Sequence, residues 1–265
     1  MVADLRWVDA GNAGPFTLEG TRTHILGRGR VAVVDPGPAL AAHVEAVVAE
    51  VERGGAQSVV LVLTHGHGDH SGATAALAAR LGAAVAGAWG GNGAEEGAAA
   101  SGPPPGLSFR RLAPDEVVVT DAGDLVAVPT PGHAREHLAF HWPAGGAVFV
   151  GDLLLGSGET TWVGAYPGCV ADYLASLDRV ERLQPRLLLP AHGGPVRDPA
   201  AHIERYRAHR LARIAQVERA LVERPDATVD EVWARVYGGA VPPALGAAAR
   251  ASVGALIEHV RGGRR

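Results

Sequence analysis

One short stretch, LVLTHGHGDHSG at residues 61–72, places three histidines and an aspartate within six positions directly after an apolar run. The run SVVLVL that leads into it has the length and β-branched content of a buried strand. A turn that leaves a sheet is a common place for ligands, because the sheet is rigid and the side chains point outward. The i, i+2 spacing of His65 and His67 lets both imidazoles point the same way, while Asp69 and His70 serve a neighbouring point. The turn therefore predicts two metal ions.

Composition limits what else the chain can be. Its 265 residues, 47% of them hydrophobic, suffice for one large domain or for a domain with a small appendage. No segment has the roughly 18 unbroken apolar residues of a membrane span, and the first residues lack the pattern of a signal peptide. We expect a cytoplasmic protein with no membrane partner. Cys169 is the only cysteine, so no internal disulfide or thiolate cluster can form, and histidine and carboxylate groups must hold any metal.

Strand and helix patterns alternate through most of the chain, which predicts an α/β (α+β) fold with helices outside the sheet. The expected strands are 30–37, 58–63, 83–87, 116–120, 124–130, 137–142, 147–152 and 186–190. The expected helices are 38–55, 72–82 and about 170–184. Residues 90–106 contain too much glycine and proline for either pattern and are expected to form a mobile surface loop.

The last part of the chain differs in pattern and in charge. Three helical segments are expected there, at about 200–223, 228–237 and 243–261. Residues 1–195 carry 12 arginines and 20 acidic residues, a net charge of −8, whereas residues 196–265 carry 12 arginines and 8 acidic residues, a net charge of +4. We therefore predict a sheet-rich catalytic domain at 1–195 and a small helical domain at 196–265.

Four ligands on one turn cannot complete two metal sites, so further histidines or aspartates are expected after later strands. Three candidates are present: His133 in PTPGH, Asp152 in VGD and His192 in LPAHG. Each follows an apolar strand and lies beside glycine or proline, so one edge of the fold is expected to collect all seven side chains. The other seven of the twelve histidines lack this pattern, and most are expected to be structural or solvated.

The motifs H-x-H-x-D-H, T-P-G-H, G-D and A-H-G, in that order, resemble those of the metallo-β-lactamase-fold hydrolases. Within that superfamily the chain is most similar to the β-lactamase-like protein 2 group, over nearly its whole length. The resemblance implies a four-layer αββα sandwich with a small C-terminal helical, winged-helix-like appendage. It also implies ligands for two ions: His65, His67 and His133 for the first, Asp69, His70 and His192 for the second, and Asp152 bridging both.

Nitrogen and oxygen donors with an open position suit catalytic zinc, and two zinc ions per chain can share a hydroxide that attacks a carbonyl or phosphorus. Iron or manganese would also fit these donors. Asp152 as the bridge and Asp69, which can orient the hydroxide, are the expected catalytic residues. Asp35 is expected either to anchor a ligand histidine or to cap its own turn. His137, four residues after the T-P-G-H histidine, either supports the site, as in many thioester hydrolases of the superfamily, or simply faces out from its strand.

The resemblance favours hydrolysis of a thioester or ester, in a small-molecule or carrier-bound acyl substrate. The best-known β-lactamases lack the bridging aspartate and use a cysteine ligand, so Asp152 points away from lactam cleavage. Polar and aromatic side chains after the Asp152 turn are candidates for the substrate pocket: Thr160, Thr161, Trp162 and Tyr166.

Two alternatives remain open. The β-lactamase-like protein 2 group includes endoribonucleases, and an arginine-rich helix at 202–224 could bind the phosphates of single-stranded RNA. Glutamates interleave with these arginines, which is also typical of a solvated helix face, and the net charge of the first 195 residues argues against RNA. The arginines of this helix that could contact phosphates are Arg205, Arg207, Arg210, Arg213 and Arg219.

The second alternative is a persulfide dioxygenase with one iron held by two histidines and one aspartate.

Overall fold

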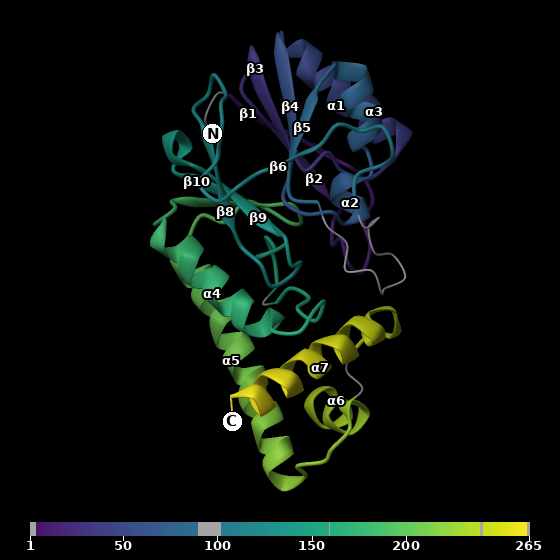
Figure 1. The fold of residues 1–265 in the computed structure, drawn as a ribbon, viewed down its shortest axis with the longest axis vertical. Helices are drawn as coiled ribbons and strands as arrows, with labels where there is room; N and C mark the ends of the chain where they lie inside the picture. Colours follow the sequence, from purple (N-terminus) through teal and green to yellow (C-terminus); the bar gives the residue numbers. More distant parts are fainter. Residues whose placement is uncertain (1–3, 90–101, 159, 239–240, 264–265) are drawn as a thin grey trace.

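Two β-sheets packed face to face form the centre of the molecule (Figure 1). The structure is a computed structural model, and it describes residues 4–89, 102–158, 160–238 and 241–263. The first sheet has the order β1-β2-β3-β4-β5-β6 and the second the order β11-β10-β9-β8-β7. The strands of the first sheet are Leu5–Asp9 (β1), Arg22–Leu26 (β2), Arg30–Val34 (β3), Ser58–Leu63 (β4), Ala84–Gly87 (β5) and Arg110–Arg111 (β6). Those of the second are Val117–Val118 (β7), Leu125–Pro129 (β8), Leu138–Trp142 (β9), Ala147–Gly151 (β10) and Leu187–Pro190 (β11).

The first sheet is buried on both faces, as its apolar strands predict. Val33 of β3 packs with the helices α1 (Ala41–Arg53) and α3 (Thr74–Leu81) on the outer face. Its neighbour Val34 packs in the cluster between the sheets, which includes Phe149 of β10. Successive strand residues point to opposite faces, so a continuous run of valines supplies both clusters.

A helix covers the outer face of the second sheet as well. Tyr173 and Leu177 of α4 (Cys169–Arg182) belong to the same apolar cluster as Val148 of β10. The layers therefore run helix, sheet, sheet, helix, which confirms the four-layer αββα sandwich.

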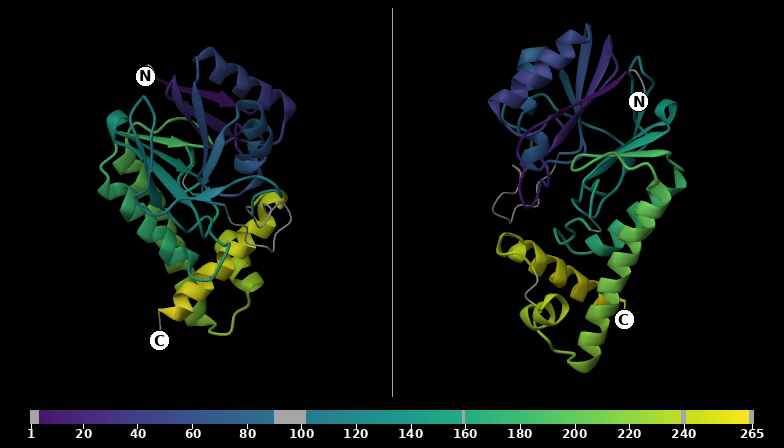
Figure 2. Two further views of the ribbon diagram at one scale, coloured as in Figure 1. Left: turned by 45° about the horizontal axis from the view of Figure 1, so that its top comes forward. Right: turned by 180° about the vertical axis from the view of Figure 1, so that it is seen from behind.

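Three α-helices follow the sandwich at one end of the molecule (Figures 1 and 2). They are α5 (Pro199–Glu223), α6 (Val229–Tyr237) and α7 (Gly246–Gly262), with the short 3-10 helix η2 (Pro243–Leu245) before α7. Asp198 caps α5 by accepting the N–H of Ala201, and Pro199 occupies its first turn. The helical appendage is thus present, while residues 196–238 and 241–263 contain no pair of strands that could form a wing.

The C-terminal helices pack on the sandwich through one continuous apolar cluster. Leu177 of α4, Ile203 of α5 and Leu256 of α7 are all buried members of it. The division of the chain between residues 195 and 196 stays a prediction, because this cluster runs across it.

Several elements differ from the expected ones. β1 and β6 lie at the edges of the first sheet and are partly exposed, so they lack the apolar runs by which the inner strands are recognised. β2 and the one-turn helix α2 (Gly68–Ser71) are also unexpected, and the strand at 116–120 is reduced to β7. Much of the expected loop at 90–106 lies outside the described residues. In the part of the chain that the structure describes, no helix is both long and apolar enough to cross a membrane.

Candidate metal centre

Seven histidine and aspartate side chains converge where strands of both sheets end. His65 and His67 come from the turn after β4, Asp69 and His70 lie on α2, and the others follow β8, β10 and β11. We call them the His/Asp cluster: His65, His67, Asp69, His70, His133, Asp152 and His192. The structure therefore brings together all seven side chains that the sequence predicts at this edge.

Three histidines form the first group of the cluster. His67 Nδ1 lies 2.9 Å from His65 Nε2 and 3.0 Å from His133 Nε2. The three rings come from the β4 turn and from the loop after β8, so both sheets contribute. Three nitrogens that face one point match the donor set of a zinc site with three protein ligands and an open position.

A second group lies beside the first. Asp69 Oδ2 is 3.2 Å from His192 Nε2 and 3.5 Å from His70 Nε2. The carboxylate of Asp152 lies between the groups, with Oδ1 3.4 Å from His70 Nε2 and 3.3 Å from His192 Nε2. Its Oδ2 is 3.6 Å from His133 Nε2 in the first group. One carboxylate therefore faces both groups through different oxygens.

Three buried atoms in or beside the second group have no hydrogen-bond partner among the described residues: His70 Nε2, His192 Nε2 and Asp152 Oδ1. Buried polar atoms in folded proteins are nearly always paired, since an unpaired one loses its hydration without compensation. A divalent cation would satisfy all three atoms, because imidazole nitrogen and carboxylate oxygen are its usual protein ligands. The residues present fit a metal ion.

Backbone carbonyls hold the outer nitrogens of two cluster histidines. His133 Nδ1 lies 3.0 Å from the carbonyl oxygen of Trp162, and His192 Nδ1 lies 3.2 Å from that of Gly20. A carbonyl only accepts, so each Nδ1 carries the proton. When Nε2 carries no proton of its own, its lone pair points into the cluster and can bind a metal ion.

Asp35, just after β3, anchors a third ring. Its Oδ1 accepts the N–H of Thr64 at 2.8 Å, and its Oδ2 accepts the Thr64 hydroxyl at 2.9 Å and lies 3.0 Å from His70 Nδ1. Asp35 also has a left-handed backbone conformation, φ 52°, in the turn that leaves β3. The Asp35 carboxylate therefore anchors a ligand histidine, and its hydrogen bonds go to Thr64 and His70 instead of capping its own turn. Thr64 is a residue that the motif alone does not single out.

His137, just before β9, lies behind Asp152. Its Nδ1 is 2.8 Å from Thr130 Oγ1, and its Nε2 accepts the backbone N–H of Asp152 at 3.3 Å. Gly151 makes this approach feasible: a Cβ there would lie 2.7 Å from His137 Nε2, and its φ of +49° disfavours other residues. The buried ring thus supports the backbone of Asp152, and the G-D motif has a steric reason for its glycine.

The two groups differ in charge when no metal is bound. Burial lowers the pKa of His67 to about 3 and that of His133 to about 4, so the first group is neutral. Burial acts in the same direction on His192, but Asp152 and Asp69 outweigh it and raise the pKa of His192 to about 10. At neutral pH the second group therefore holds protons that a metal ion has to displace.

Of the expected pocket residues, Trp162 lies beside the cluster. Its ring centroid is 5.8 Å from that of His133 and 6.3 Å from that of His67. Thr160 and Thr161 precede it, the first exposed and the second buried. Trp162 therefore forms one wall next to the first group.

Tyr166 is directed elsewhere. Its hydroxyl donates to Asp172 Oδ2 of α4 at 2.9 Å, and the guanidinium of Arg135 lies 4.1 Å from its ring centroid. Its side chain is buried, so the structure shows it as a contact of α4, and its expected place in the pocket stays a prediction.

A loop between β1 and β2 also reaches the cluster. Thr21 Oγ1 lies 3.5 Å from Asp69 Oδ2, and Asn12 fixes Thr21 by accepting its backbone N–H at 2.7 Å and donating to its Oγ1 at 3.0 Å. The sequence gives no strand pattern here, so only the pairing of β2 in the sheet reveals these contacts.

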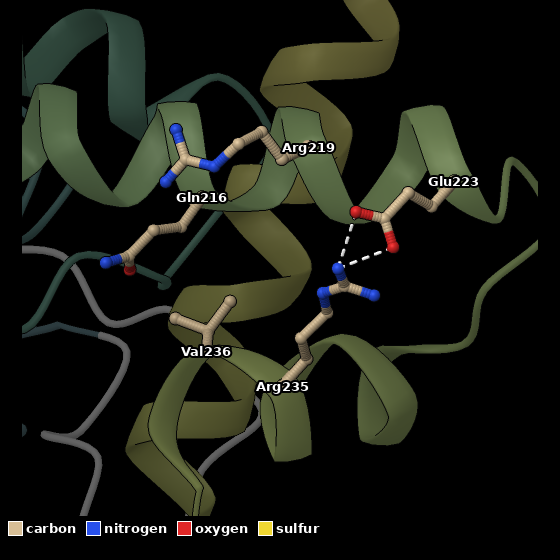
Figure 3. Close-up of a pocket in the computed structure, with 5 residues that line it drawn as sticks. All are labelled: Gln216, Arg219, Glu223, Arg235 and Val236. Atoms are coloured by element: carbon tan, nitrogen blue, oxygen red, sulfur yellow. Dashed lines mark hydrogen bonds and ion pairs between the residues drawn. The ribbon is translucent and has the colours of Figure 1, made fainter.

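A cavity of about 200 Å³ lies apart from the cluster, between α5 and α6 (Figure 3). It is lined by Gln216, Arg219, Glu223, Arg235 and Val236. Glu223 and Arg235 form an ion pair across it at 2.5 Å, and no member of the His/Asp cluster lines it. The candidate site is therefore the His/Asp cluster, where the buried nitrogen and oxygen atoms without a hydrogen-bond partner lie.

Replacing Asp35 with asparagine is expected to weaken metal binding about ten- to a hundredfold. The amide has one acceptor oxygen, and if its NH₂ faces His70, the ring proton moves to Nε2 and removes the lone pair from the cluster. Affinity is measured by competition with a chromophoric chelator. Asp121→Asn is the control, because this carboxylate caps another turn. An equal loss in both variants would contradict the anchoring role of Asp35.

Residues 22–192 match the Metallo-beta-lactamase superfamily, from the start of β2 to the last histidine of the cluster. The chain is 27% identical to the Beta-lactamase-like protein 2 homolog of Caenorhabditis elegans, over 85% of this chain and 74% of that protein. It is 30% identical to the Atrochrysone carboxyl ACP thioesterase of Aspergillus chevalieri, over 86% of this chain and 71% of that protein.

The fold is similar to that of a beta-lactamase domain protein from Burkholderia ambifaria, with a TM-score of 0.81 and 23% identity over 98% of this chain and 86% of that one. That likeness concerns the architecture, whereas the superfamily match covers the residues of the cluster itself. Because this match includes nearly all of both sheets and every strand end that supplies the cluster, the chain belongs to the metallo-β-lactamase superfamily.

Proposed function

We propose that this protein hydrolyses a thioester or ester with two zinc ions bound at the His/Asp cluster. The observation that supports two ions is the position of Asp152, whose two oxygens face different groups of histidines. The first ion would be held by His65, His67 and His133, the second by Asp69, His70 and His192, and Asp152 would be shared.

Two bound ions would supply an activated water nucleophile and polarise the acyl oxygen. Asp69 is available to orient that water, since its side chain is 26% exposed. Burial acts to raise its pKa, but His70 and His192 outweigh it and lower the pKa of Asp69 to about 2. The carboxylate is therefore ionised and accepts hydrogen bonds at neutral pH. Trp162 would offer an apolar surface beside the first group, next to His67 and His133.

A carboxylic thioester or ester as the substrate is supported by the relative that is named a carrier-protein thioesterase. On this proposal the acyl group is presented by a small molecule or by a carrier.

The arginines of α5 give the RNA alternative little support, because several are engaged within the protein. Arg207 forms ion pairs with Asp178, Glu181 and Glu204. Arg210 is buried, so it lies on neither a solvated face nor a phosphate-binding one. Arg219, by contrast, is exposed and lines the cavity between α5 and α6 (Figure 3).

The zinc-loaded protein is expected to hydrolyse acyl-thioesters and to leave single-stranded RNA intact. Arg224 directly follows α5 and is exposed like Arg219. The double variant Arg219→Gln/Arg224→Gln should retain its thioesterase kcat/KM within about threefold, because exposed charges contribute little. Cleavage of both substrate classes is measured across a range of salt concentrations.

RNA cleavage that falls steeply as the salt concentration rises, and less steeply in the double variant, would favour the RNA alternative over thioester or ester hydrolysis. Metal analysis of the same preparation addresses the dioxygenase alternative. Two zinc ions per chain would agree with the proposal, and a single iron that supports persulfide oxidation would contradict it.

A further inference from the structure

Segment 153–162, of which residue 159 is not described, joins two parts of the metal centre. It begins directly after Asp152 and ends with Trp162, whose carbonyl accepts the Nδ1–H of His133. Within it, the N–H of Gly156 donates to the carbonyl of His192 at 2.7 Å. The described residues of the segment form no helix or strand, so contacts with other elements have to fix its path.

One face of α5 supplies several of the contacts that fix this segment, and Tyr173 of α4 adds a hydrogen bond to the carbonyl of Leu153 at 3.1 Å. His202, Tyr206 and Arg210 are spaced i, i+4 and i+8, so they lie in a row along the helix. All three side chains are buried, with 4%, 1% and 3% of their surface exposed. We call this row the α5 face.

Each residue of the α5 face binds backbone of the segment. His202 Nε2 donates to the carbonyl of Leu155 at 2.8 Å, and Tyr206 Oη accepts the N–H of Leu155 at 3.3 Å. The Tyr206 hydroxyl also lies 3.1 Å from the carbonyl oxygen of Ser157. Arg210 Nη2 donates to the carbonyl of Thr161 at 3.0 Å, one residue before the carbonyl that holds His133.

Arg210 is the unusual member of the row. None of the ion pairs found among the described residues includes it, and its Nε is buried without a partner. Its guanidinium lies 5.1 Å from the ring centroid of Tyr173, which stabilises the charge in part. A buried charge without a carboxylate partner is costly. The hydrogen bond to the Thr161 carbonyl and the Tyr173 ring are therefore the contacts that keep the Arg210 guanidinium in place.

We propose that His202, Tyr206 and Arg210 are positioning residues of the metal centre: through segment 153–162 they set the places of Asp152 and of the Trp162 carbonyl. The inference rests on the proposed dinuclear site and adds a role for the C-terminal helices. On this view α5 is required for metal geometry, in addition to packing on α4. α7 also contacts this segment, because the carbonyl of Ala248 accepts the indole N–H of Trp162 at 3.1 Å.

The test uses the full chain, freed of metal and titrated with cobalt(II), whose visible absorption depends on coordination geometry. The variants are Tyr206→Phe, which removes one oxygen, Arg210→Gln, and Arg210→Lys, which keeps a donor. Arg207→Gln is the matched control, since it is the same change on the same helix at a residue that pairs with α4. Melting temperatures are recorded in parallel.

Tyr206→Phe and Arg210→Gln are expected to raise the Kd of the more weakly held cobalt ion roughly tenfold and to alter its spectrum. Arg210→Lys should restore part of the loss, and Arg207→Gln should leave both readings unchanged. Variants that melt earlier but bind cobalt with the wild-type affinity and spectrum would overturn the inference. If the Arg210 variants do not fold, Tyr206→Phe decides alone. A wild-type protein that binds no cobalt would instead overturn the proposed function, and the inference with it.

Discussion

Replacement of Asp152 with alanine is expected to lower hydrolysis by roughly a thousandfold, since a metal ion supplies several kcal/mol of transition-state stabilisation and each 1.4 kcal/mol is about tenfold. Asp152 is the one described carboxylate that faces both groups of histidines. The variant should therefore also lose metal, with at most one tightly bound ion per chain. Activity and metal content are measured on the same preparation.

Asp152→Asn separates the charge from the shape, because asparagine fills the same space with one acceptor oxygen. We expect it to keep the fold and to lose most of the second ion. Asp178→Asn is the control, an exposed carboxylate of α4 that pairs with Arg207. Full activity with two bound ions in either Asp152 variant would contradict a shared carboxylate.

The cluster was predictable because its signal is local. β4 ends at Leu63, β8 at Pro129, β10 at Gly151 and β11 at Pro190, and each is followed within four residues by a cluster residue. Apolar runs locate strand ends well, since both faces of these sheets are buried. A polar metal-ligating side chain beside glycine or proline at such an end is then informative without knowledge of the fold.

The supporting contacts were predictable only in part: Asp35 and His137 were expected candidates, but the groups that they contact are brought to them only by the fold. Asp35 reaches Thr64 and His70 across 29 and 35 positions of sequence. Edge strands and β2 lack the apolar pattern, so the loop that carries Asn12 could not be placed beside the cluster. Sequence patterns report burial along one element and give no register between elements.

The arginines of α5 show the same limit on a single helix. Arg207 and Arg210 are the same residue type, three positions apart on α5. Arg207 pairs with carboxylates of α4, whereas Arg210 is buried against segment 153–162. A long helix with interleaved charges is typical of a solvated face. The difference is decided by the close packing of α5 on α4, which the sequence of α5 does not contain.

Removal of metal by a chelator is expected to abolish hydrolysis and to turn the second group into a proton-binding site. In the metal-free protein His192 has a pKa of about 10, because Asp152 and Asp69 outweigh burial. The pKa of His70 is likewise raised well above its usual value, against burial, by Asp69, Asp152 and Asp35. Zinc added at pH 7 should therefore release protons, measured with an indicator dye in weak buffer.

Protonation of His192 also makes the stability of the metal-free protein depend on pH. The folded-state pKa of His192, about 10, is above the ordinary value of 6.5, so its protonation stabilises the fold fully below about pH 6.5. That contribution is lost as the pH rises through about 10. We expect the free energy of unfolding of the metal-free protein to fall between pH 7 and pH 10, and that of the zinc-loaded protein to change less, because zinc has replaced the proton.

His192→Gln removes the titrating ring and should weaken both effects, the proton release and the loss of stability at high pH. The first group serves as the internal control. Burial lowers the pKa of His67 to about 3 and that of His133 to about 4, so an ion bound there displaces no proton at pH 7. If zinc binding released no protons, or if the metal-free protein became more stable towards pH 10, the carboxylates would not hold protonated histidines, and the proposed charge difference between the two groups would be wrong.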